Sequence, residues 1–222
     1  IMDTQVQGYI SFKDKFFDDK LDVFAQLFGE TRDYRRERVW AYSQGGLIYN
    51  GYWSTGASKS QAAGVTHLRR QQDRSFFGTA SFGWDRTYYL ELSLRNDWSS
   101  TLPDNNNSYL YGSASLAADI NRYLPNVTWL DFWKLRGSVA QVGSTMDPYQ
   151  VYETYASSAK YEELSAMSMS TRELNLGIKP TISTSWEIGT EFKMFKNRLW
   201  GDINYYVKNT KNQIINLPVA PT

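Results

Sequence analysis

The sequence has no cysteine and only one histidine, His67, among 222 residues. Without thiols the chain can form neither a disulfide scaffold nor a thiolate metal site. One histidine cannot make a multi-histidine metal site, and no histidine-based triad is recognisable around His67. An S-x-x-K pattern occurs at 157–160, but the companion S-D-N and K-T-G motifs are missing. We therefore predict no catalytic, metal or cofactor site.

The chain also lacks an excess of charge and a long apolar run. Its 24 Lys and Arg are balanced by 23 Asp and Glu, so it has no electrostatic footprint for nucleic acid. No stretch of about 18 apolar residues is present, which excludes a transmembrane helix but not barrel strands. The chain begins at Ile1 without a leader of the secretory type. We expect that the start of the protein is missing.

Aromatic residues are abundant, at 16%, and apolar side chains are dispersed through a polar sequence. In 88–97 they alternate strictly: Tyr88, Leu90 and Leu92 fall on one face, and Glu91 and Ser93 fall on the other. Such a period of two predicts a β-strand with one apolar and one wet face. The pattern predicts eight strands, at 4–17, 21–31, 76–84, 88–98, 109–119, 130–142, 186–194 and 199–208.

The connections between these strands differ in length. Short turns are predicted at 18–20, 85–86 and 195–197, with a moderate one at 120–129; the alternate connections are long at 32–73 and 143–182, and intermediate at 99–107. Short periplasmic turns and long external loops are typical of outer-membrane barrels. The whole chain, 1–222, is thus predicted to be one domain, the antiparallel wall of a transmembrane β-barrel.

The two faces of these strands predict two environments. The Leu, Phe and Trp set is expected to face lipid, whereas Lys134, Arg136, Glu187 and Glu191 are expected to face the lumen. Aromatic residues near strand ends predict girdles at the membrane interfaces. These residues are Trp84, Tyr88, Trp98, Trp129, Trp133, Trp186 and Trp200.

Four phrases add a family resemblance: YYLELSLRNDWSS at 88–100, FWKLRGSVAQVG at 132–143, LNLGIKPTISTSWEIGTE at 174–191 and FKNRLWGDINYYVKNT at 195–210. In order and spacing, over roughly 75–215, they resemble the C-terminal barrel of SusC/RagA-like TonB-dependent outer-membrane transporters. The resemblance implies eight strands of a barrel of about 22 strands, closed by an N-terminal plug. The plug and the TonB box are not in this chain.

The resemblance also implies a function and partners. It implies active import across the outer membrane of a Gram-negative cell, of oligosaccharides or peptides captured by a SusD-like surface lipoprotein. The TonB-ExbB-ExbD complex would supply energy through the missing N-terminal part. Candidate substrate contacts are loop tyrosines able to stack on sugar rings, although they could equally pack the loop on itself. They are Tyr149, Tyr152, Tyr155 and Tyr161.

Two other architectures fit the alternation. Eight is a permitted number of strands for a closed barrel, so the chain could be a complete adhesin or structural anchor. It could also be a secreted β-sandwich that binds carbohydrate through its aromatic loops. The sandwich predicts that the apolar face around Leu135 is buried between two sheets.

Overall fold

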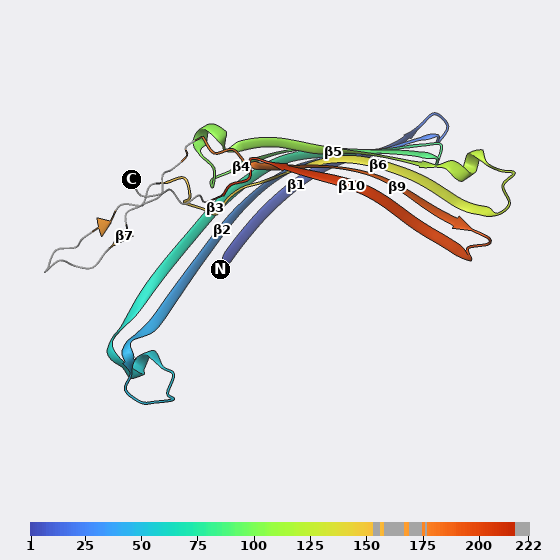
Figure 1. Cartoon of the computed structure of the whole chain (residues 1–222). Coiled ribbons are helices and arrows are strands. Elements are labelled where there is room, and N and C mark those ends of the chain that lie inside the picture. Colours follow the sequence, from blue (N-terminus) through green and yellow to red (C-terminus); the bar gives the residue numbers. More distant parts are fainter. Residues whose placement is uncertain (153–155, 158–166, 169–174, 176, 216–222) are drawn as a thin grey trace, which may run out of the picture.

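The computed structural model describes residues 1–152, 156–157, 167–168, 175 and 177–215. Eight strands form one antiparallel sheet in the order β1-β2-β3-β4-β5-β6-β9-β10 (Figure 1). Their bounds are β1 Met2–Phe16, β2 Leu21–Leu47, β3 Ser58–Trp84, β4 Tyr88–Ser99, β5 Ser108–Asp119, β6 Leu130–Ser144, β9 Thr181–Met194 and β10 Leu199–Lys211. The eight predicted strands are confirmed.

Short elements complete the described part of the chain. β7 (Ala156–Ser157) pairs with β8 (Met167–Ser168) in a separate ladder. Three 3-10 turns lie in connections: η1 Thr55–Ala57, η2 Asp104–Asn106 and η3 Ile120–Tyr123. In the residues that the structure describes, no helix has the length and apolarity to cross a membrane.

One face of the sheet, here called the apolar face, carries a band in which apolar side chains predominate. Cross-strand pairing aligns Ile10, Leu27 and Gly78, and further along aligns Leu135, Thr190 and Ile203. Among the described residues no other element covers this band: Ile10 is 77% exposed and Ile188 is 61% exposed. Side chains on one strand face project together because the pleat has a period of two. A tilted barrel strand needs only about ten residues, every second one apolar, to cross lipid.

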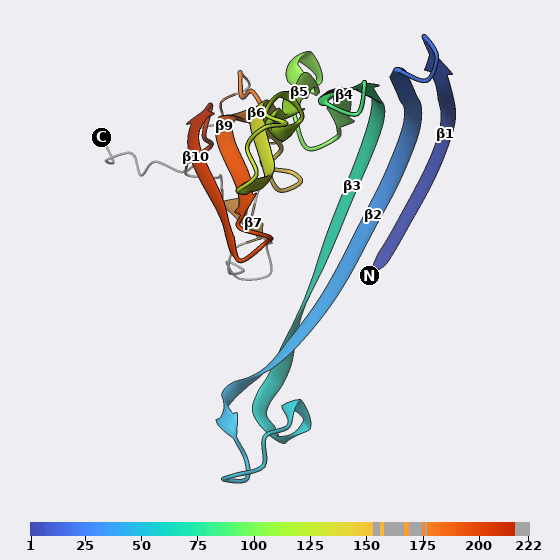
Figure 2. The same cartoon turned by 90° about the vertical axis from the view of Figure 1, so that its right-hand side faces the viewer.

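The sheet is single and open. Among the described residues the only buried apolar side chains are Ala57, Leu102 and Val151, so no second sheet packs on the apolar face. The β-sandwich interpretation is therefore wrong. The edge strands β1 and β10 do not pair with each other and lie far apart in Figure 2, which contradicts a closed eight-stranded barrel.

The short turns gather at one end of the sheet and the long connections at the other (Figure 1). Asp85 and Arg86 turn the chain with φ of 50° and 53°, and Phe17 to Asp19 and Phe195 to Asn197 also have positive φ. Left-handed turn residues match the right-handed twist of antiparallel strands. The three predicted short turns are confirmed.

The prediction of an irregular loop over 32–73 was wrong. β2 and β3 continue as a paired ribbon through Tyr42 and Ala63, and only 48–57 connects them. Beyond Arg35 the ribbon has no β1 partner, and beyond Asp73 it has no β4 partner. Both faces of the ribbon meet solvent. Its two strands can therefore pair through backbone hydrogen bonds without alternating apolar and polar residues. In 143–182, β6 reaches Ser144 and β9 begins at Thr181.

Aromatic side chains flank the apolar band as predicted, with one exception. At the short-turn end the ring of Trp84 lies 6.1 Å from Phe17, and Trp129 lies 6.3 Å from Phe195. At the opposite end of the band stand Trp98 and Trp186. Trp200 is different, because it lies opposite Lys193 and so belongs to the polar face.

Candidate functional site

The second face of the sheet, here called the polar face, carries the charged residues. Lys134 lies opposite Glu191, and Arg136 lies two positions along the same strand. On β9, Glu187 lies four residues from Glu191, so the two side chains are on the same face of the strand. The prediction that these residues share a face, opposite to Leu135, is confirmed. In a barrel wall this face lines the lumen.

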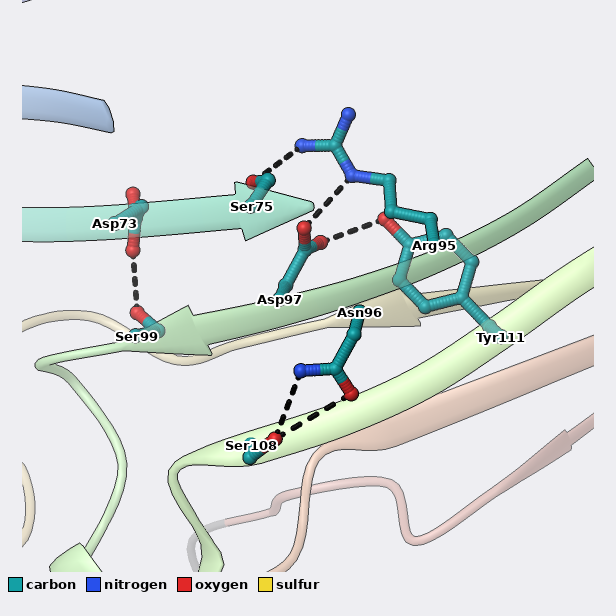
Figure 3. A network of polar contacts seen from close by, with 8 residues as sticks. All are labelled: Asp73, Ser75, Arg95, Asn96, Asp97, Ser99, Ser108 and Tyr111. Atoms are coloured by element: carbon teal, nitrogen blue, oxygen red, sulfur yellow. Dashed lines mark hydrogen bonds and ion pairs between the residues drawn. The ribbon is translucent and has the colours of Figure 1, made fainter. Parts of the chain in front are cut away.

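A buried polar network joins β3, β4 and β5 at the outer end of the polar face (Figure 3). Arg95 donates from Nε to Oδ1 of Asp97 at 2.7 Å and from Nη2 to Oγ of Ser75 at 2.8 Å. The hydroxyl of Tyr111 donates to the second oxygen of Asp97 at 2.6 Å. Asp97 is only 8% exposed and Ser75 7%. Each carboxylate oxygen has a donor, so the buried charge is fully compensated.

Aromatic rings extend this network across β1 and β2. The guanidinium of Arg95 lies 4.8 Å from the ring centre of Phe77, which stacks on Phe28 at 4.4 Å. Phe28 in turn lies 5.6 Å from Tyr9. Cation–π and stacking contacts add to the backbone ladder. The result is a continuous ladder of side chains from β1 to β5 that fixes the polar face as a rigid surface.

The connection after β4 folds back against this network. The hydroxyl of Ser99 donates to Asp73 at 2.5 Å and lies 3.0 Å from that of Thr101. Ser100 and Gln72 exchange two hydrogen bonds, one through the Ser100 hydroxyl. Thr101 and Leu102 are 0% and 2% exposed. This loop is therefore held in place and is not a free tether.

A second charged cluster crosses β9 from β6 to β10. Nη2 of Arg136 donates to Asp202 at 2.8 Å and to Oδ1 of Asn204 at 2.6 Å. The intervening residue is Gly189, where an added Cβ would collide with Asn204 and Arg136. A side chain at Gly189 would force Arg136 and Asn204 to shift, because the long Arg136 side chain lies directly over the β9 backbone.

The structure places two of the four predicted substrate tyrosines. Tyr149 and Tyr152 bracket one turn, closed by a 3.4 Å backbone hydrogen bond, and they are 46% and 57% exposed. The Tyr149 hydroxyl accepts from the Arg70 backbone N–H at 3.1 Å, and Asp147 pairs with Arg69 at 3.3 Å. This turn is docked on β3, yet part of each ring stays open. Tyr155 and Tyr161 lie outside the described residues.

Sequence reasoning missed the β2–β3 ribbon as a site. Its tip exposes aromatic side chains: Trp40, Tyr42, Tyr49, Tyr52 and Trp53 are each more than half exposed. The density of Trp and Tyr over 40–53 was a usable signal. Lower on the ribbon, Asp33 accepts from Arg70 at 2.8 Å and raises the pKa of its guanidinium.

These arrangements consist of ion pairs, hydrogen bonds and exposed aromatic rings. In the described part of the chain, no group of three or more His, Cys, Asp or Glu could hold a metal ion. His67 packs its ring 5.1 Å from Trp40 on the ribbon. Hydrogen-bonding charges inside and an apolar band outside are the properties of a membrane channel wall.

A sequence profile of the family described as "TonB dependent receptor-like, beta-barrel" matches residues 2–222. The chain belongs to this family. Such barrels lie in the outer membrane, and the expected localisation is confirmed. Two TonB-dependent receptors of Formosa agariphila, P26 and P3, are 27% and 22% identical to the chain over 67% and 69% of its length. The chain spans 16% of each.

Solved structures of this family share the fold. The RagAB peptide transporter superposes with a TM-score of 0.85 at 23% identity, over 98% of this chain and 24% of the solved one. The RagAB peptide importer in its closed-closed state gives 0.84. An open sheet is expected of a chain that covers about a quarter of the length of such a protein, and the SusC/RagA-like resemblance is confirmed.

Proposed function

We propose that the chain is part of the wall of a TonB-dependent importer of oligosaccharides or peptides. The observation that carries this is the separation of a predominantly apolar face from a hydrogen-bonded polar face across one eight-stranded sheet. The P26 and P3 receptors and the RagAB importer support the same role. TonB-ExbB-ExbD would drive import through a plug outside this chain.

The end with long connections is the proposed meeting place of substrate and a SusD-like lipoprotein. The ribbon tip, the docked loop after β4 and the Tyr149–Tyr152 turn all lie there. Exposed Trp and Tyr suit both partners, because their rings stack on sugars and anchor protein interfaces. Trp53, at 89% exposed, is the most accessible ring.

A transport assay with the full-length protein tests this function. Cells lacking the gene should fail to take up either labelled oligosaccharides or labelled peptides, and should regain uptake with the intact protein. Loss of TonB should abolish uptake equally. Normal uptake of both classes without the gene would refute the proposal. An affinity-tagged barrel should also co-purify a surface lipoprotein.

A further inference from the structure

The apolar face has a hollow over β1 to β5, with a volume of about 560 Å³. Gly78 lies at its floor, where even an added Cβ would approach Cδ2 of Leu27 to 3.0 Å. Asn96 lines it too and donates to Ser108 at 3.0 Å. Its other walls are mainly aliphatic and aromatic side chains: Ile10, Phe12, Leu27, Phe76, Leu94 and Leu110. The wall of a membrane barrel is bathed in lipid at this depth, so only an apolar chain can fill the hollow.

An unpaired cation stands above the hollow. On β3, Arg74 lies two residues from Phe76 in the direction of the long connections. Residues two apart on a strand share a face, so Arg74 is on the apolar face. Its cross-strand neighbours are Thr31 and Trp98, neither of them acidic. Within the described ranges no carboxylate pairs with Arg74, whereas Arg32 pairs with Asp3 at 2.5 Å.

The position of Arg74 matches the headgroup level of the outer leaflet. The long connections mark the external side of a barrel, and Arg74 sits at that edge of the apolar band. Trp98 beside it is the kind of side chain that lies at the membrane–water interface. Arg74 and Gly78 are four positions apart on β3, which is about 13 Å at the usual rise.

We propose that the hollow and Arg74 together bind one anionic, phosphate-bearing membrane lipid. An acyl chain occupies the hollow above Gly78, and the phosphate accepts hydrogen bonds from the Arg74 guanidinium. Trp98 packs at the junction of chain and headgroup. The site requires only that this face meets lipid, and it is independent of which substrate the barrel imports.

Native mass spectrometry of the delipidated full-length protein in detergent tests the site. The probes are phosphatidylglycerol and phosphatidylcholine with identical acyl chains, and inorganic phosphate alone. The intact protein should retain phosphatidylglycerol about fivefold better than phosphatidylcholine, the preference that one arginine near a membrane surface supplies. It should retain no phosphate without an acyl chain.

Two variants, each with a matched control, separate the headgroup from the hollow. Arg74→Gln should remove the preference and leave the acyl chain bound, whereas Arg198→Gln, on an exposed turn at the far end, should keep it. Ala80→Leu fills the hollow and should weaken retention of both lipids. Ala118→Leu makes the same change on the apolar face outside the hollow, and it should leave the retention of both lipids unchanged.

Three results would overturn the site. They are equal retention of both lipids by the intact protein, equal behaviour of the two arginine variants, and equal behaviour of the two alanine variants. Electrophoresis without heating confirms that each variant is a folded barrel before lipid is added. Uptake assays on the same variants are separate, so a lost lipid site and a failed import model are distinguishable.

Discussion

At the scale of single residues, the polar face holds its charges by pairing them across strands. Asp97 is the centre, because Arg95 on the same strand and Tyr111 on β5 each donate to a carboxylate that solvent hardly reaches. A buried charge that loses one partner costs far more than an exposed pair contributes. The network therefore fixes β3, β4 and β5 relative to one another.

The substitution Asp97→Asn should destabilise the barrel by roughly 1.5 to 3 kcal/mol, since it leaves Arg95 without its counter-charge. Urea unfolding of the full-length protein in detergent measures the loss. The control is Asp22→Asn, which breaks the exposed Lys15–Asp22 pair at 3.5 Å and should cost less than about 1 kcal/mol. Equal costs would show that the network carries no special stability.

Residue spacing predicted some of this site and could not predict the rest. Arg95 and Asp97 are two positions apart on one strand, so their shared face follows from the pleat. Ser75 and Tyr111 join them only because of the register of β3 and β5 against β4. Register over such long strands depends on many pairs at once, and no single motif specifies it.

At the scale of elements, strands inside the band were predictable and the ribbon was not. A strand between lipid and water must alternate, as residues 88–97 do, whereas a ribbon with solvent on both faces has no such constraint. Backbone pairing extends β2 and β3 through 32–47 and 58–73, assisted by the Asp33–Arg70 ion pair and the Trp40–His67 ring contact. This difference in environment explains why the strand at 199–208 was predicted correctly and the strands within 32–73 were missed.

Adjacent residues on β9 test the two faces. Ile188→Arg places a charge in the apolar band and should cost about 2 to 4 kcal/mol or prevent insertion. Glu187→Arg makes the same new side chain on the polar face and should insert normally. Membrane fractionation and urea unfolding measure both. Similar defects in the two variants would contradict the assignment of faces.

Shortening the ribbon tests its proposed role at the external end. Replacing residues 39–66 with Asn-Gly joins Arg38 to His67, which lie opposite each other in the ladder, through a turn that suits a hairpin. The barrel should still fold, because the apolar band is untouched. Co-purification of the surface lipoprotein should fall severalfold. Unchanged recovery would exclude the ribbon from the interface.

At the scale of the whole molecule, the chain is a sheet whose two long edges need partners. β1 and β10 each present unpaired N–H and C=O groups, which lipid cannot satisfy. The RagAB chain that it matches is longer, since this chain spans 24% of it. We therefore expect the sheet to be stable only where further strands pair with both edges.

Residues 1–222 expressed alone should aggregate in detergent, because two open edges template further pairing. Size-exclusion chromatography with light scattering measures the particle. The full-length protein, in which both edges are paired, should elute as one defined species. A discrete particle of 25.6 kDa from the isolated chain would contradict this and favour the small closed barrel.

The two-stranded ribbon also has a mechanical consequence. It continues for about 12 residues past Arg35, or about 40 Å, and no third strand braces it among the described residues. A tilt of about 5° at its foot displaces the tip by roughly 3 to 4 Å over that span. A small rotation of the wall at the foot of the ribbon would therefore move the aromatic tip by several ångströms.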